Sequence, residues 1–140
     1  MDTLPPKDRV LAACRGTVHG DHPVLRWASE LAEVHHRRIT ANPVAHNDIE
    51  QQRAALIRAI DQWVAARLPP SPGCARIHTE SLGAVIDRLS KFTACAFAAL
   101  ATADEWELWD AWQRLAELAV GYDDLTDEVA TGRRRLPGTR

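Results

Sequence analysis

The sequence predicts an all-α protein: an antiparallel bundle of four long amphipathic helices, preceded by a short N-terminal helix. Apolar residues recur at helical spacing almost throughout the chain, and sustained alternation of Val, Ile and Thr is absent. Short breaks rich in Pro and Gly separate the helical segments, which is typical of antiparallel neighbours. The 140 residues suffice for one domain. We expect a flexible arm at 1–7, the bundle domain at 8–137 and a tail at 138–140.

The first three helices have recognisable ends. A short helix is expected near 9–18, before Gly20. The second begins with Pro23 in its first turn, where a missing N–H loses no hydrogen bond, and the break "TANPVAH" follows it. The third opens with Asn47 and Glu50, the spacing of a capping box, and ends before "LPPSPGC".

The last two helices follow the same rules. The stretch "HTESLGAVIDRLSKFTACAFAAL" supplies the fourth, with Thr79 as its expected cap. The fifth begins near "TADE" and runs to about Thr131, with Gly132 in the position just after a helix end. We therefore expect helices near 23–38, 47–68, 79–100 and 104–131, and no pair of hydrogen-bonded strands within 22–137.

Composition argues against several classes of protein. A net charge of −2 creates no positive field for nucleic acid, and the longest mainly apolar run, "FTACAFAALATA", is too short to span a bilayer. Cys14, Cys74 and Cys95 form no C-x-x-C pair, so neither a zinc knuckle nor a disulfide framework is indicated. We expect a cytoplasmic protein with no cofactor and with neither nucleic acid nor membrane as a partner.

Three polar residues fall in the middle of apolar stripes. Since a helix turns about 100° per residue, His35, Arg53 and Tyr122 face the core from three different helices. An arginine in such a position must be paired, because an unpaired buried charge is very costly. Each residue has a simple structural interpretation: a satisfied core histidine, a salt-bridged arginine and a core tyrosine. The alternative is that the three converge on a site in the bundle interior.

The fourth helix offers acidic partners for them. Glu80 and Asp87 are two turns apart and lie on one line, which Lys91 continues. The line is opposite the apolar centre, so one interpretation is a solvated face on which Glu80 favours the helix N-terminus. In the other interpretation this helix is central, and Glu80 or Asp87 pairs with Arg53.

These segments also resemble a known family. "HTESLGAVIDRLS" resembles the T-E-x-x-x-x-x-I-D-R-L-S signature of the domain-of-unknown-function 4254 family of bacterial proteins. "HPVLRWASELAEVHHRR", "IEQQRAALIRAID" and "LTDEVATGRRRLP" resemble its other segments, in the same order, over 22–137. The resemblance implies an all-helical protein without a settled biochemical role. It departs after Lys91, where longer members carry Lys and His that this chain lacks. The motif residues map onto Arg53, Asp61, Thr79, Glu80, Asp87 and Arg88.

Metal sites have weaker support. Glu33 and His36 form one E-x-x-H, half of a di-iron motif whose second copy is absent. Glu30 and Glu33 form an E-x-x-E, as in helical Mg²⁺-dependent nucleotide pyrophosphohydrolases, which would need partners such as Asp123 and Asp127. No metal ligand is therefore assigned.

Two tryptophans suggest a contact surface. Trp106 and Trp109 drift to the outer side of the last helix, whereas Trp112 lies on its main stripe. Tryptophan is favoured at protein contacts, so this flank could meet the arm, a ligand or a second subunit. The tail "GRRRLPGTR" carries four arginines that could touch phosphate or neutralise the acidic segment before them.

The function expected from these residues is binding of a small polar molecule in a pocket among the helices, with catalysis left open. The alternatives are an interaction protein that forms a homodimer through the Trp flank, and a Mg²⁺-dependent hydrolase. A pocket that reaches at least two of His35, Arg53, Glu80 and Asp87 would favour a site over a scaffold. Without it, the function would move to the Trp flank and the arginine tail. The expected acid/base groups are Glu80, Asp87 and His35, and the expected ligand-binding residues are Arg53, Arg88, Tyr122 and Asp61.

Overall fold

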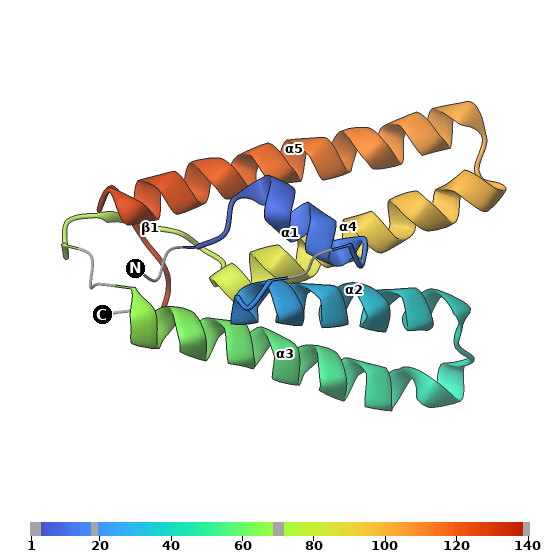
Figure 1. The fold of residues 1–140 in the computed structure, drawn as a ribbon, viewed down its shortest axis with the longest axis horizontal. Helices are drawn as coiled ribbons and strands as arrows, with labels where there is room; N and C mark the ends of the chain where they lie inside the picture. The colour runs from blue at the N-terminus through green and yellow to red at the C-terminus, as the bar shows by residue number, and fades with distance from the viewer. Residues whose placement is uncertain (1–3, 18–19, 69–71, 139–140) are drawn as a thin grey trace.

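The computed structural model describes residues 4–17, 20–68 and 72–138, and it is helical over most of them (Figure 1). The predicted all-α class and the four long helices are confirmed. The elements are α1 (Lys7–Cys14), α2 (Pro23–Thr40), a 3₁₀ turn η1 (Pro43–Ala45), α3 (His46–Arg67), α4 (Leu82–Thr102) and α5 (Glu105–Ala130).

The start of α4 differs from the prediction. Ser81, not Thr79, is its N-cap, because the Ser81 side chain accepts a hydrogen bond from the backbone N–H of Ala84. The helix therefore begins at Leu82, and Glu80 lies in the segment before it. The expectation that Glu80 and Asp87 share one line of a single helix is wrong for this reason.

The expectation of no strand pair is also wrong. Strands β1 (Arg76–Ile77) and β2 (Arg134–Arg135) form a short parallel pair. Gly132, with φ +76°, turns the chain after α5, and the segment beyond it runs extended beside the segment before α4. Backbone groups outside the helices find partners there, as in the 2.9 Å hydrogen bond from His78 N–H to the Arg135 carbonyl. A two-residue strand has no readable alternation, so the sequence gives no signal for it.

Helix α4 is central to the fold. It contacts α1, α2, α3 and α5, whereas α5 rests on α4, α1 and β2 and has no contact with α3 in the described ranges. Figure 1 shows α5 along one edge of the bundle and α3 along the opposite edge. The buried small residues Gly83, Ser90 and Ala94 are among those that let neighbouring helices approach α4. This arrangement agrees with the interpretation in which the fourth helix is touched on more than one side.

The N-terminal segment lies against the core from Leu4 onward. Leu4 packs on the core cluster, and Pro5 is buried and accepts a 2.8 Å hydrogen bond from the Tyr122 hydroxyl. Residues 1–3 of the expected arm and residues 139–140 of the expected tail lie outside the described residues. None of the helices in the described part of the chain has the length and apolar character needed to cross a bilayer.

Candidate functional site

His35, Arg53 and Asp87 meet where α2, α3 and α4 pack together. The His35 Nε2 atom lies 2.7 Å from Asp87 Oδ1. Arg53 donates from Nε to both carboxylate oxygens, at 3.0 and 3.1 Å, and from Nη2 to Oδ2 at 2.9 Å. The predicted pairing of Arg53 with a carboxylate of the fourth helix is therefore confirmed, with Asp87 as the partner.

Further ion pairs connect Arg53 to the surface. Arg53 Nη1 donates to Glu50 Oε2 at 2.7 Å, and Arg38 Nη1 lies 2.9 Å from Glu50 Oε1. The Asp87 side chain is 4% exposed, whereas that of Arg53 is 31% exposed, less buried than expected. These residues, His35, Asp87, Arg53, Glu50 and Arg38, are called the α2–α4 ion-pair network below.

The network keeps Asp87 ionised. Burial raises the pKa of Asp87, but hydrogen bonds and positive charge from His35 and Arg53 outweigh it and hold the pKa below its usual range. The hydrogen bond to Asp87 raises the pKa of Arg53 in turn. An ionised carboxylate only accepts hydrogen bonds, so Nε2 of His35 carries the proton and donates it. The other ring nitrogen, Nδ1, has no hydrogen-bond partner among the described residues.

His35 also lines a cavity between α2 and α4. The cavity has a volume of about 300 Å³, and its other lining residues are Arg38, Ile39, Lys91 and Cys95. Two of these side chains are cationic and none is acidic. The cavity is thus lined by groups that favour a negative charge.

The expected pocket shared by the charged residues is not found among the three main cavities. Those of about 500 and 380 Å³ lie beside the end of α1 and between α2 and α3, and neither is lined by His35, Arg53, Glu80 or Asp87. The third reaches His35 alone of the four. The physical reason is that Arg53 and Asp87 satisfy each other and leave no space between them.

Glu80 and Arg88 lie apart from the network. They pair with each other at 2.8 Å, partly exposed to solvent. Because Glu80 precedes α4, its side chain does not follow the helical line toward Asp87.

Asp61 and Tyr122 make structural contacts instead. Asp61 Oδ1 accepts a 2.7 Å hydrogen bond from the Gly83 N–H in the first turn of α4. Tyr122 is fully buried, and its hydroxyl donates a hydrogen bond to the Pro5 carbonyl. Burial raises the pKa of this hydroxyl, which therefore stays a donor.

The sequence prediction placed Lys91 on the line of Asp87 but missed Glu50, Arg38 and Cys95 as members of this region. A signal was present for Glu50 and Arg38. Glu50 precedes Arg53 by three positions and Arg38 follows His35 by three, so each shares a helix face with a residue that was singled out.

Carboxylates do not gather into a metal site in the described part of the chain, where no group of three or more His, Cys, Asp or Glu side chains could hold an ion. Asp123 accepts a hydrogen bond from the Lys7 N–H, and Asp127 pairs with Arg133. The cluster that a Mg²⁺-dependent hydrolase would need is therefore not formed by these residues.

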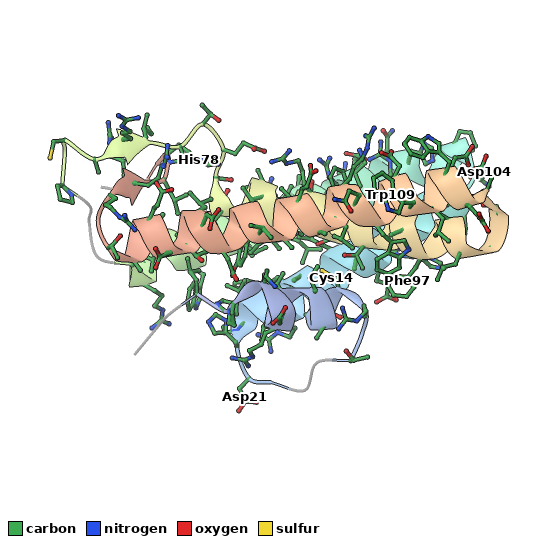
Figure 2. The ribbon with its side chains drawn as sticks, turned by 90° about the horizontal axis from the view of Figure 1, so that it is seen from above. Cys14, Asp21, His78, Phe97, Asp104 and Trp109 are labelled. Carbon is green, nitrogen blue, oxygen red and sulfur yellow. The ribbon has the colours of Figure 1, made fainter. Side chains whose placement is uncertain are left out.

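The Trp flank is exposed. Trp106 and Trp109 are 68% and 56% exposed, and their rings stack with centroids 5.4 Å apart. Figure 2 shows Trp109 in the half of the molecule where α5 begins, near Asp104. The described residues of a single chain do not cover these two indoles, although the sequence predicts a contact there.

Comparison with known proteins gives one match. A family model described as "Protein of unknown function (DUF4254)" matches residues 26–137, most of the chain. No curated protein and no solved structure matches. The resemblance noted in the sequence is thereby confirmed.

Proposed function

Because the chain belongs to the DUF4254 family, described only as proteins of unknown function, we propose its function from its own side chains: it binds a small anionic molecule in the cavity between α2 and α4. The ligand would carry a carboxylate or phosphate group. One observation carries the proposal, namely that His35, held by the buried Asp87, lines a cavity together with Arg38 and Lys91.

Charge supports an anionic ligand. Arg38 is already paired with Glu50, but Lys91 is exposed and forms no ion pair with a described residue. A lysine ammonium is a strongly hydrated point charge, well suited to a partly open phosphate or carboxylate site. The guanidinium of Arg38 adds a second cation without losing its own partner.

His35 gives the site its chemistry. Its Nε2–H is fixed by Asp87, so the ring orientation is set and Nδ1 is the atom available to a ligand. A protonated ring donates to an anion from Nδ1, and a neutral ring offers a lone pair there. A carboxylate that orients an imidazole also serves proton transfer, so the same pair would supply a general base to a reactive ligand.

Cys95 allows a direct test, because it lines the cavity while Cys74 is exposed elsewhere. Alkylation of each thiol by iodoacetamide would be followed by mass spectrometry, with and without inorganic phosphate or acetate. We expect either or both anions to slow alkylation of Cys95 and to leave Cys74 unchanged.

Two variants give the matched control. Lys91→Ala should abolish the protection, whereas Arg88→Ala, an exposed cation one turn earlier on α4 and outside the cavity, should leave it intact. Equal rates for Cys95 with and without both anions would overturn the proposal. The same would follow if the two variants behaved alike. A reducing compartment such as the cytoplasm, which keeps Cys95 as a thiol, is part of this proposal.

Self-association is the second candidate. The exposure and stacking of Trp106 and Trp109 favour a contact there. Sedimentation of the purified protein tests it: a dimer that Trp106→Ala dissociates would support a homodimer through this flank, and a monomer at all concentrations would exclude one.

A further inference from the structure

Helix α5 has a second stripe on the side away from the core. The buried residues Leu115, Ala119, Tyr122 and Leu125 mark its inner side. Positions on the opposite side are all exposed, although they follow the same helical spacing. The outer stripe is defined here as Trp106, Trp109, Glu117, Val120 and Asp124.

The first half of the outer stripe is aromatic. The two stacked indoles form one continuous surface, and Val120, 52% exposed, is a separate apolar side chain about three turns further along the same side. A single exposed tryptophan is ordinary, but neighbouring large apolar side chains on a surface mark interaction sites.

The charge of α5 is strongly one-sided. Residues 105–130 contain eight Asp and Glu and one Arg, a net charge of −7, whereas the whole chain carries −2. Three of these acids are paired with arginines, two of which lie beyond residue 130: Asp110 with Arg114, Asp127 with Arg133 and Glu128 with Arg134. Glu117 and Asp124, on the outer stripe, form no ion pair with any described residue.

Such a surface selects its partner by charge. A second copy packed symmetrically against this face would bring the unpaired acids of two α5 helices to one interface, and like charges across an interface are unfavourable. A partner with Lys or Arg beside apolar side chains would instead pair with the acids and place cations over the indole faces.

The shape of the surface favours a helix as that partner. Because α5 lies along one edge of the bundle, no other helix of the described ranges covers its outer side (Figure 1). From Trp106 to Asp124 the stripe is straight and about 27 Å long, at about 1.5 Å per residue. We propose that the outer stripe of α5 docks a basic amphipathic helix of another protein. Its apolar residues would lie on Trp106, Trp109 and Val120, and its cations would face Glu117 and Asp124.

The probe is a fluorescein-labelled peptide of about 18 residues, the length of the stripe. It carries Leu along one helical face and Lys on either side of it, and the counterpart has Glu in place of every Lys. Fluorescence anisotropy would measure binding to the intact chain. We expect the basic peptide to bind, more weakly as salt rises, and the acidic peptide not to bind.

Substitutions locate the contact. Trp106→Ala with Trp109→Ala should weaken binding by about tenfold or more, as expected for central aromatic contacts. Glu117→Lys with Asp124→Lys should do the same. The matched control is Asp21→Lys with Glu30→Lys, two exposed acids of equal charge change elsewhere. Figure 2 shows Asp21 projecting away from α5. The control should change affinity by less than about twofold, since distant charges are screened.

Three outcomes would overturn the proposal. If the charge reversals on the stripe and those of the control weaken peptide binding equally, the overall charge of the protein attracts the peptide and the outer stripe does not select it. If the acidic peptide binds as well as the basic one, charge does not select the partner. If the free protein is a dimer that the double Trp substitution dissociates, the outer stripe is occupied by a second copy. All the substituted residues are exposed, and circular dichroism of each variant verifies that the helices are retained.

Discussion

Asp61 on α3 accepts a 2.7 Å hydrogen bond from the backbone N–H of Gly83 in the first turn of α4. The first N–H groups of a helix have no partner within it, so α3 supplies one across the interface. The approach is close enough to restrict the side chain at position 83. A Cβ atom there would lie 2.6 Å from the Ile57 carbonyl oxygen and 2.7 Å from Asp61 Oδ1.

Gly83→Ala should therefore destabilise the protein although alanine favours helix. The backbone of α3 must shift to admit the methyl group, and overpacking of this kind lowers the free energy of unfolding by about 1–3 kcal/mol. Urea denaturation measures it. Gly121→Ala is the control, because a methyl group there would meet no neighbouring group within 4 Å, and α5 should gain about 0.5–1 kcal/mol. Equal changes at the two positions would contradict the close approach.

Arg53→Ala should lower the melting temperature sharply. It leaves the buried carboxylate of Asp87 with His35 alone, and breaking a buried pair typically costs about 3–5 kcal/mol. Arg88→Ala, which breaks the exposed pair with Glu80, should cost less than about 1 kcal/mol. Thermal unfolding of the two variants makes the comparison. Similar losses would show that the α2–α4 ion-pair network contributes no more than a surface pair.

Asp87 should make stability fall at acid pH. Its pKa is below 3.8 in the folded chain, so the unfolded chain takes up the proton first as the pH falls. The stabilisation is complete above this ordinary value and is lost as the pH falls toward the lowered folded-state pKa. Asp87→Asn removes this dependence, so the difference in unfolding free energy between wild type and variant should shrink below about pH 4. A difference independent of pH would show that the carboxylate charge is not what stabilises the fold.

Tyr122→Phe should loosen the N-terminal segment. The substitution leaves the buried Pro5 carbonyl without its donor and should cost about 1–3 kcal/mol. Hydrogen exchange measured by NMR should show faster exchange at the amides of Arg9 and Val10, both of which donate to the Pro6 carbonyl. Amides in the middle of α3 serve as the internal reference, and an equal change there would indicate global destabilisation instead.

The sequence predicted the long helices because each repeats its apolar side chains over several turns. It also predicted the pairing of Arg53, since a charged residue in the middle of a stripe needs a partner. It misplaced Glu80 because the helical line was drawn through residues that precede the real cap, Ser81. Because the real cap lies two residues after Thr79, Glu80 falls outside the helix and has no position on its wheel, and helix ends are where sequence patterns are weakest.

The cavity beside His35 could not be predicted in the same way. Its existence depends on how the side chains of α2 and α4 pack against each other, whereas the apolar periodicity of a sequence describes one helix at a time. The role of Asp61 was equally hidden. An Asp on a helix face is as suitable for a ligand as for a neighbouring backbone N–H, and only the position of Gly83 distinguishes them.

The short pairing of β1 with β2 bears on how the chain is completed during synthesis. Strand β2 leaves the ribosome after all the helices, while its partner β1 was made before α4. The helices can associate through contacts close in sequence, which form quickly, whereas the strand pair must wait for a distant segment. Strand β1 thus stays without its strand partner throughout the translation of α4 and α5.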